Sequence, residues 1–319
     1  KNFPKYKGFD FWDFYKNDWY NSFIGISAVD NLMYLALFEE VLKKCNKKTT
    51  ITYLLENQGW EIGMLSACRL FGIKKTIGFS HATSRYWDLR NFYDLREYLS
   101  KSLLRLPRPK ILAVNSENVL FQFLKFGYPK DEIKLTEALR HSHLNKENIS
   151  RFNKKNKNKD KTLLLFGDYE DSNTKYQISV LNQLSKDTLN NLELIFKPHP
   201  ASTLNINSLT SLKIRITDDP IADLLPLSKI AFCSSVTSAA IDAFSYGLKV
   251  IILKDPTILN LSPLRNFRDV SFVKDSLELQ KIIIKFFSQN NYSVSQRVIF
   301  KLSDDLPLWK KLLYETIKI

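Results

Sequence analysis

"KIAFCSSVTSAAIDAFSYGLKVIIL", residues 229–253, contains a complete strand–turn–helix–strand unit. Its two apolar runs, "KIAF" and "KVIIL", have the length of buried strands, and "TSAAIDAFSYG" between them has a helical pattern. Gly247 follows the last helical residue, the usual position of a glycine that ends a helix. Because strands joined through a helix pair in parallel with a right-handed crossover, this segment predicts an α/β domain built on a parallel sheet.

The same alternation continues through the C-terminal half of the chain and, more loosely, through the N-terminal half. In the C-terminal half it predicts strands at 161–168, 192–200 and 213–219, and helices at 176–188 and 221–228. In the N-terminal half it predicts strands at 49–56, 75–81 and 110–116, and helices at 61–72 and 117–127. Each half therefore has the pattern of a doubly wound, Rossmann-like domain.

A polar, low-complexity segment, "NKENISRFNKKNKNKDK", separates the two halves at residues 145–161. Such composition is typical of linkers and long surface loops. We therefore expect an N-terminal domain over residues 1–148, a linker over 149–160 and a C-terminal domain over 161–303. An amphipathic helix at 304–319 is expected to follow and to pack back on the first domain.

The opening segment, "FPKYKGFDFWDFYKNDWYNSF" at residues 3–23, is crowded with aromatic side chains. The ordinary explanation is a helix or hairpin that packs into the core. The alternative is that the rings lie beside an acceptor site, where they stack on sugars. The sequence leaves both explanations open, with the first favoured.

Composition and charge restrict the class of protein. Apolar residues make up 44% and charged residues 25% of the 319 residues, which is typical of a soluble globular protein, and no apolar run approaches the ~20 residues that span a bilayer. Three scattered cysteines predict reduced core thiols in a cytoplasmic protein. The net charge of +14 suggests an anionic partner, either nucleic acid, a phospholipid surface or a phosphorylated substrate, unless it reflects a general lysine and asparagine bias.

A phosphate site is predicted from two strand ends of the C-terminal half. His199 lies between Pro198 and Pro200 directly after one strand, and Ser234 and Ser235 follow another, where we expect a helix to start at about residue 236. Ligands of open α/β sheets bind at the carboxyl ends of the strands. A histidine and a serine-capped helix start at such ends suit a phosphate group. The alternatives are a histidine bonded within its own turn and plain helix capping.

"KPHP" followed about 35 residues later by "SSVTSAAIDAFSYG" resembles the C-terminal domain of bacterial GT-B glycosyltransferases that use CMP-activated sugars, among them sialyltransferases, polysialyltransferases and Kdo transferases. The CDP-glycerol glycerophosphotransferases of teichoic acid synthesis have a similar pair of motifs. The resemblance implies two Rossmann-like domains facing a cleft. It also implies nucleotide contacts from His199, Ser234 and Ser235, to which we add their motif neighbours Lys197 and Thr237.

The N-terminal half carries a second resemblance. "YLLENQGWEIGML", "KKTIGFSHATSRYWDLRNF" and, in the other half, "DPTILNLSPLR" resemble bacterial surface-carbohydrate proteins of the O-antigen type. Glu56 ends a strand and is the expected general base. His81 ends another strand, where related transferases carry a "QHG"-like turn, but Ser80 and Ala82 replace its glutamine and glycine here.

Further contacts with donor or acceptor are expected from two groups of residues. Glu61 and Arg85 follow strand ends of the N-terminal half, although Glu61 is also placed to favour a helix dipole. Asp168 and Glu170 follow the first strand of the C-terminal half, where the resemblance places the donor; capping of the next helix is the alternative. His141 and His143 have no carboxylate or cysteine at ligand spacing, so no metal site is predicted.

Together these features predict a metal-independent glycosyltransferase without a cofactor. It would move a Kdo-like or sialic-acid-like sugar from a CMP-activated donor to a cell-surface glycan acceptor, in the cytoplasm at the inner face of an anionic membrane. One alternative is a polyol-phosphate transferase that uses a CDP-alcohol with His81 as base. The other is a basic nucleic-acid-binding protein, against which stands the lack of any helix-turn-helix, RNP or KH signature; no nucleic-acid partner is therefore expected.

Overall fold

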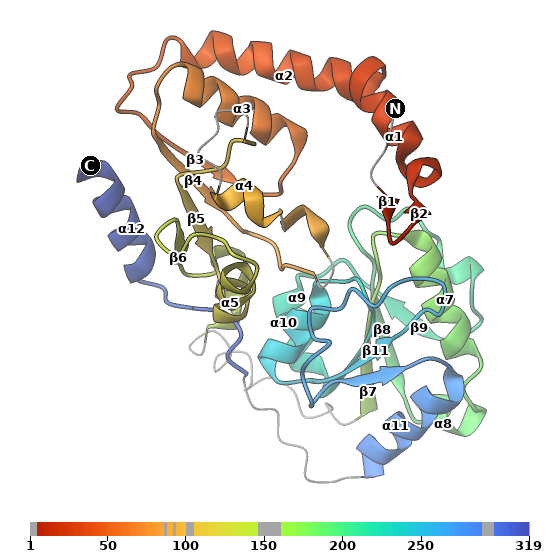
Figure 1. The fold of residues 1–319 in the computed structure, drawn as a ribbon. Coiled ribbons are helices and arrows are strands. Elements are labelled where there is room, and N and C mark those ends of the chain that lie inside the picture. Colours follow the sequence, from red (N-terminus) through yellow and green to blue (C-terminus); the bar gives the residue numbers. More distant parts are fainter. Residues whose placement is uncertain are drawn as a thin grey trace.

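The chain forms two α/β lobes in a computed structural model that describes residues 5–85, 88–91, 94–99, 105–145, 161–288 and 297–318 (Figure 1). The N-terminal lobe is built on a four-stranded sheet of order β3-β4-β5-β6, and the C-terminal lobe on a six-stranded sheet of order β12-β11-β10-β7-β8-β9. Every pairing within these two sheets is parallel. The linker expected at 149–160 lies outside the described residues, so its boundaries stay a prediction.

The elements of the N-terminal lobe follow the expected alternation after an opening hairpin and two helices. They are β1 (Lys5–Tyr6), β2 (Phe9–Asp10), α1 (Trp12–Ile24), α2 (Ile26–Leu42), β3 (Thr50–Leu54), α3 (Gly59–Leu70), β4 (Lys75–Phe79), α4 (Leu95–Leu99), β5 (Ile111–Val114), α5 (Glu117–Lys125) and β6 (Ile133–Leu135). Short 3₁₀ helices occupy Leu89–Asn91 and Leu139–Leu144.

The elements of the C-terminal lobe also alternate as expected. They are β7 (Thr162–Phe166), α7 (Asp171–Asn182), α8 (Lys186–Asn190), β8 (Glu193–Lys197), β9 (Ile214–Ile216), α9 (Ile221–Leu224), β10 (Ile230–Ser234), α10 (Ala239–Tyr246), β11 (Lys249–Leu253), β12 (Ser271–Val273) and α11 (Ser276–Ser288). Two further 3₁₀ turns lie at Ile206–Ser208 and Leu225–Leu227.

The strand order of the C-terminal sheet determines where a ligand binds. Counted along the chain from β7, it is 3-2-1-4-5-6, the order of the doubly wound dinucleotide-binding fold. The order reverses between β7 and β10, and ligands of this fold bind at the carboxyl ends of the strands on either side of such a reversal. Both faces of the sheet are covered by buried apolar side chains, in two separate clusters. The core therefore fixes the strand ends that carry the candidate site.

Helix α10 begins later than the sequence suggested. We expected it to start at about residue 236 with Ser234 and Ser235 as caps, but it begins at Ala239, and Ser238 is the N-cap residue without a side-chain capping bond. Val236 and Thr237 are 4% and 7% exposed, so a buried turn, rather than the helix, follows β10. The helix ends as predicted, at Gly247, whose φ of 111° is a conformation that glycine adopts without strain.

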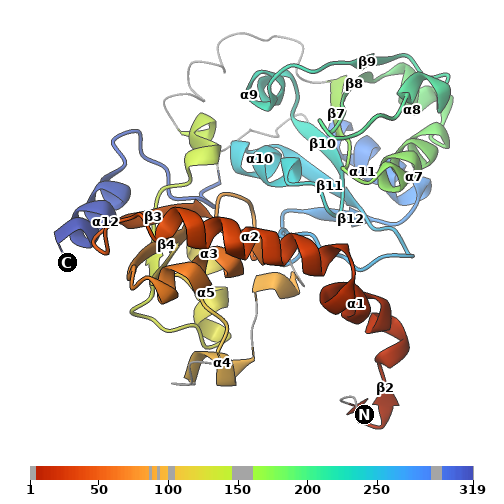
Figure 2. The same cartoon turned by 90° about the horizontal axis from the view of Figure 1, so that it is seen from above.

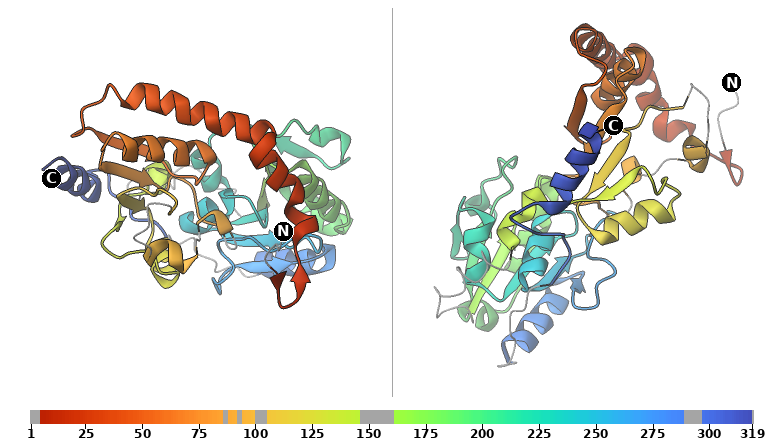
Figure 3. Two further views of the ribbon diagram at one scale, coloured as in Figure 1. Left: turned by 45° about the horizontal axis from the view of Figure 1, so that its top comes forward. Right: turned by 90° about the vertical axis from the view of Figure 1, so that its left-hand side faces the viewer.

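The last helix, α12 (Pro307–Lys318), returns to the N-terminal lobe, as Figures 1 and 3 show. Trp309 and Leu312 pack with Ile77 and Ala113 on one face of the N-terminal sheet. The carboxylate of Glu137 accepts the backbone N–H groups of Leu308 and Trp309, at 2.8 and 3.0 Å. The chain thus crosses between the lobes a second time before it ends.

The aromatic opening segment does not pack into the core. Phe14, Trp19, Tyr20 and Phe23 are 75%, 43%, 55% and 65% exposed on α1, which corrects the favoured expectation of a core-packing element. Helix α1 continues across a 43° bend into α2, which packs on α3 along one side (Figure 2).

Candidate active site

The candidate nucleotide site lies at the switch point of the C-terminal sheet, where β7, β8 and β10 end side by side. His199 follows β8 by two residues, Asp168 follows β7 by two, and Ser234 is the last residue of β10. Gly167 lets these chains approach closely, because a Cβ atom there would lie 2.9 Å from the ring of Phe196. The sheet therefore brings together residues more than 60 positions apart in sequence.

His199 presents one ring nitrogen to the outside of the sheet. The backbone N–H of Ala201 donates to its Nδ1 at 3.2 Å, so the neutral ring carries its proton on Nε2. The side chain is only half-buried, and the Tyr169 ring lies against it edge-on at 6.2 Å between centroids. The turn bond foreseen as the alternative role is thus present, and it leaves Nε2–H as a donor for an anion.

The hydroxyl groups after β10 divide into two kinds. The Ser234 hydroxyl donates its proton to the Asp168 carboxylate, so it has only lone pairs left, which a phosphate oxygen does not bind. Within the described residues, no hydrogen bond occupies the hydroxyls of Ser235 and Thr237. Of the three candidates in this turn, only Ser235 and Thr237 therefore keep a hydroxyl proton to donate, and both side chains are buried, at 3% and 7% exposed.

Asp168 does not reach a donor sugar, contrary to expectation. It is fully buried, and besides the Ser234 hydroxyl it accepts the backbone N–H of Glu170 at 3.1 Å. Its carboxylate joins the loop after β7 to the end of β10, so its role is to position the serine-rich turn. Glu170 is exposed and makes no side-chain capping bond, which leaves its carboxylate at the surface of the same loop.

Lys197 is directed to the other side of His199. Its Nζ donates to the backbone oxygen of Asp218, 3.2 Å away in the loop after β9. In the order β10-β7-β8-β9, the loop after β9 and the serine-rich turn after β10 lie on opposite sides of β8, which ends at Lys197. The contact with Asp218 therefore holds the ammonium away from the serine-rich turn. The ammonium of Lys197 is thus not directed at this turn, where its phosphate contact was predicted.

In the N-terminal lobe, Glu56 and His81 form a pair. They follow the neighbouring strands β3 and β4, and His81 Nε2 lies 3.3 Å from Glu56 Oε1. The Glu56 side chain is 48% exposed, whereas Nδ1 of His81 is buried without a hydrogen-bond partner. The accessible group of the pair is therefore the carboxylate, and the histidine supports it from behind.

Glu61 supports Glu56 from within the lobe. We expected it to contact a substrate, but it is only 2% exposed and is not accessible to one. Its carboxylate accepts the backbone N–H groups of Glu56 and Gln58, at 2.8 and 3.1 Å, as part of a capping box at the start of α3. Burial raises the pKa of the Glu61 carboxyl, although these backbone hydrogen bonds act in the opposite direction. The alternative, a role at the helix start, is the one that the structure supports.

Arg85 connects the two halves of the site. Its guanidinium lies 5.2 Å from the ring centroid of Tyr169, which in turn contacts His199. The loop after β4, which begins with His81, therefore reaches the loop after β7 across the interface between the lobes. Tyr169 was not predicted, although its position between two acids at the end of a strand was a usable signal.

A second contact between the lobes lies behind the site. His141 Nδ1 is 2.7 Å from Asp242 Oδ1 of α10, and the His141 ring stacks on Phe300 at 3.9 Å between centroids. His143 Nε2 is 3.7 Å from the same carboxylate oxygen. Sequence spacing did not reveal Asp242 as their partner, because it is 101 residues from His141. Among the described residues, no group of three or more histidine, cysteine, aspartate or glutamate side chains is arranged to hold a metal ion.

Comparison with known proteins establishes the fold. No protein-family model matches the chain, and no curated protein matches it in sequence. The solved structure of UDP-GlcNAc 2-epimerase from Methanocaldococcus jannaschii is similar over 89% of this chain and 82% of its own, with a TM-score of 0.58 at 13% identity.

Two further structures have the same architecture. MurG from Acinetobacter baumannii matches over 92% of this chain and 81% of its own, with a TM-score of 0.52 at 10% identity. UGT89C1 from Arabidopsis thaliana matches over 85% and 71%, with a TM-score of 0.51 at 11% identity. Identities this low concern the fold alone, and the expected GT-B class of two Rossmann-like domains is confirmed. Because an epimerase shares this fold, the reaction has to be argued from the site.

Proposed function

We propose that the protein is a glycosyltransferase that moves a sugar from a CMP-activated donor to a glycan acceptor. The observation that carries the proposal is that hydrogen-bond donors end strands of one lobe and an accessible carboxylate ends a strand of the other, with a chain of ring contacts between them. His199, Ser235 and Thr237 offer donors at the switch point of one lobe, while Glu56 is accessible at the strand ends of the other. The Arg85–Tyr169–His199 contacts support their opposition across the interface between the lobes.

In the proposed reaction, Glu56 activates the acceptor and the groups of the C-terminal lobe stabilise the leaving CMP. Glu56 takes the proton of the acceptor hydroxyl, whose oxygen bonds to the anomeric carbon of the donor. The bond between that carbon and the phosphate oxygen breaks, and its electron pair stays on CMP. The Nε2–H of His199 and the hydroxyls of Ser235 and Thr237 stabilise the charge that develops on the phosphate. One phosphate leaves, which is why we propose that no metal ion or cofactor is needed.

The donor identity rests on the motif resemblance. The HP and serine-rich motifs occur in this chain at the ends of β8 and β10, the two positions that the resemblance requires. We therefore propose a CMP-activated Kdo-like or sialic-acid-like sugar as the donor and a cell-surface glycan, as in lipopolysaccharide or capsule, as the acceptor. A cytoplasmic location at the inner face of the membrane is part of the proposal, supported by three free cysteines, which are usual in a reducing compartment.

The polyol-phosphate alternative requires His81 to act as base. Nε2 of His81 faces Glu56, and its other nitrogen is buried, so no ring nitrogen is open to a substrate hydroxyl. This geometry favours Glu56 as the base and the sugar transfer over the polyol-phosphate transfer. The arrangement also gives the nucleic-acid alternative no support, because the convergent groups are few and suit one phosphate.

The test is a donor panel with the purified chain. Release of CMP from CMP-sialic acid and CMP-Kdo is measured beside release of UDP from UDP-glucose and of CMP from CDP-glycerol, each with and without a glycan acceptor. We expect turnover with a CMP-sugar only. Turnover with UDP-glucose alone would retain the glycosyltransferase and refute the donor, whereas turnover with CDP-glycerol would refute sugar transfer.

A further inference from the structure

Helix α2 is apolar on two opposite sides, and the protein covers only one of them. On the covered side Leu42 is buried and Phe38 packs near Trp60 of α3, with ring centroids 6.3 Å apart. On the other side the exposed apolar residues recur at helical spacing and continue into the end of α1. This outer face consists of Phe23 (65% exposed), Ile24 (81%), Ile26 (77%), Val29 (55%), Leu32 (66%), Met33 (65%), Leu37 (55%) and Val41 (51%).

An uncovered apolar face of this extent needs an explanation. Single exposed apolar residues are normal on protein surfaces, but contiguous ones mark a contact with a partner or a membrane. Within the described ranges no single helix is long and apolar enough to cross a bilayer, and the α1–α2 pair that together has the composition is bent by 43°. Since α2 is also held against α3, the geometry suits a helix that lies in the plane of an interface.

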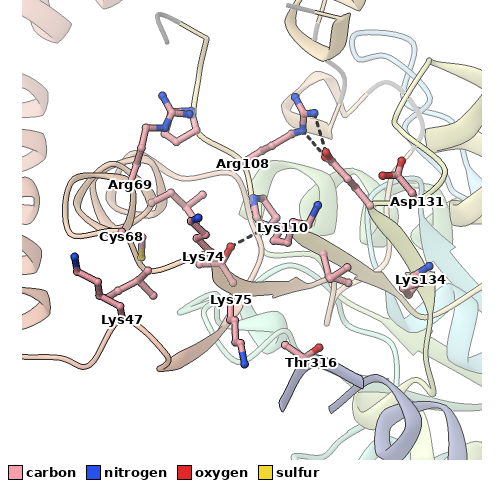
Figure 4. A pocket seen from close by; sticks show the side chains of 18 of the residues that line it. Lys47, Cys68, Arg69, Lys74, Lys75, Arg108, Lys110, Asp131, Lys134 and Thr316 are labelled. Carbon is pink, nitrogen blue, oxygen red and sulfur yellow. Dashed lines mark hydrogen bonds and ion pairs between the residues drawn. The ribbon is translucent and has the colours of Figure 1, made fainter. Parts of the chain in front are cut away.

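The end of α2 leads directly into a basic hollow. Lys43, Lys44, Lys47 and Lys48 follow the helix within six residues. The hollow has a volume of about 1080 Å³ and lies at the amino ends of β4 and β5, the sheet edge away from the candidate active site (Figure 4). Its basic lining residues are Lys47, Lys48, Arg69, Lys74, Lys75, Arg105, Arg108, Lys110 and Lys134, and its acidic ones are Asp131, Glu132 and Glu315.

Part of this positive charge is not balanced by an ion pair within the described residues. Arg108 is paired with Glu132 at 2.7 Å. For Lys47, Lys74 and Lys134, the described part of the chain shows no ion pair. Such a hollow fits phosphate groups, and the apolar face beside it fits acyl chains.

The acids on the outer face itself limit how deep it can go. By helical position Asp30 and Glu40 lie among its apolar side chains, and Glu40 is paired with Lys43. Two carboxylates oppose burial in hydrocarbon, and α1 adds Trp19 and Tyr20, which prefer the boundary between water and lipid. The helix is therefore suited to the headgroup level.

We propose that the outer face of α1–α2 and the adjoining basic hollow form one docking surface for an anionic lipid bilayer. The apolar side chains enter the boundary of the acyl chains, and the hollow receives lipid phosphates. The charge of the hollow, within a chain of net charge +14, favours a bilayer over a second copy of the same basic chain. The proposal does not depend on the donor or on the reaction.

The experiment is co-sedimentation of the full chain with vesicles of phosphatidylcholine, with and without 30% phosphatidylglycerol (about one lipid in three). We expect binding to the anionic vesicles that weakens with salt, and little binding to phosphatidylcholine alone. The apolar variant Ile26→Gln with Met33→Gln should bind at least about tenfold more weakly. The basic variant Lys47→Gln with Lys48→Gln should lose roughly tenfold to thirtyfold on anionic vesicles.

Matched controls lie in the C-terminal lobe. Leu277→Gln with Ile284→Gln changes two residues that are also seven positions apart on one helix, and 69% and 52% exposed. Lys186→Gln with Lys213→Gln removes the same charge as the basic variant from exposed positions. Both controls should bind vesicles like the unchanged chain, and circular dichroism checks that every variant is folded.

The proposal is overturned by three results. The first is that the unchanged chain does not bind the vesicles. The second is that the α2 and lysine variants reduce vesicle binding no more than their matched controls do. The third is a dimer in sedimentation velocity that Ile26→Gln with Met33→Gln converts to monomer without any lipid effect, because the face would then be covered by a second copy.

Discussion

Glu56 and Glu61 show how one short stretch gives two carboxylates different tasks. They are five residues apart, yet Glu56 remains half exposed beside His81, while Glu61 is buried and holds the backbone of Glu56 in place. The difference arises because α3 starts at Gly59 and its N-terminal turn needs an acceptor for free N–H groups. The residue that is available to a substrate is thus held by one that is not.

Replacing Glu56 by glutamine tests its role as base. The amide keeps the size of the side chain and can still bond to His81, but it cannot take a proton. We expect sugar transfer to fall by on the order of 10²–10⁴, with CMP affinity nearly unchanged, in steady-state assays and calorimetric titration. Glu117→Gln, at an exposed site on α5, should leave both unchanged. Normal turnover in Glu56→Gln would remove Glu56 from the mechanism.

Asp168 is expected to matter for stability and, through Ser234, for nucleotide binding. Asp168→Ala leaves the Ser234 hydroxyl and the Glu170 N–H without their acceptor, and each such group costs ~1–3 kcal/mol. Urea unfolding should therefore show a loss of about 2 kcal/mol or more, together with weaker CMP binding. Asp219→Ala removes an exposed pair with Arg215 and should cost less than ~1 kcal/mol. Equal costs for both variants would contradict the positioning role.

At the scale of elements, the short 3₁₀ helix at Leu139–Leu144 makes the contact between the lobes sensitive to pH. Burial lowers the pKa of the His143 imidazole. The nearby Asp242 carboxylate acts to raise this pKa, and the neighbouring His141 acts to lower it. The unfolded chain takes up a proton at this residue as the pH falls through about 6.5, before the folded chain does. The free energy of unfolding should therefore decrease as the pH falls below that value.

Thermal unfolding between pH 7.5 and pH 5.5 measures this effect. In His143→Gln the decrease of the melting temperature over this range should be smaller than in the unchanged chain, since one group with a lowered pKa is gone. The matched control His199→Gln, at the half-buried histidine after β8, should keep the decrease that His143 causes. If the two variants have the same pH dependence as the unchanged chain, His143 is not responsible.

Most strands of both sheets were predictable from local pattern, because a buried strand needs an apolar run. The short strands β6 and β12 were not predicted, and the helix expected at 176–188 is divided into α7 and α8. The start of α10 was not predictable, since Val236 and Thr237 fit a helix pattern but are used in a buried turn. The exposure of α1 and α2 was also not predictable. Their apolar residues predict burial, but the sequence does not show whether they are buried against the same chain or against a partner or membrane.

At the scale of the whole molecule, α12 ties the end of the chain to the first lobe. Trp309 is 7% exposed and also donates its ring N–H to the backbone oxygen of Glu137 at 2.9 Å. Trp309→Ala should destabilise the protein by about 3–5 kcal/mol, as expected for a large buried side chain, in urea unfolding. Tyr314→Ala on the same helix is the control, because that residue is 59% exposed. Similar losses in both would refute the packing role.

The position of His199 and the serine-rich turn at one edge of the sheet was predictable, because a parallel sheet brings the carboxyl ends of its strands together. That both groups bind the same phosphate stays a prediction. The contacts between the lobes were not. Arg85 with Tyr169, and His141 with Asp242, join residues that share no local pattern, and only the folded arrangement brings them together. Lys197 and Asp168 were predicted to face the ligand because they lie in the right loops, but hydrogen bonding turns both elsewhere.

Calorimetric titration of the unchanged chain and His199→Ala with CMP, UMP and UDP tests the central claim most directly. A hydrogen bond to a charged phosphate contributes about 1.5–3 kcal/mol. We therefore expect CMP to bind best and His199→Ala to bind it roughly tenfold or more weakly with its fold intact. His143→Gln serves as the control and should bind CMP normally. Equal CMP affinity in His199→Ala, or preference for UDP, would contradict the assignment of this site to a CMP-activated donor.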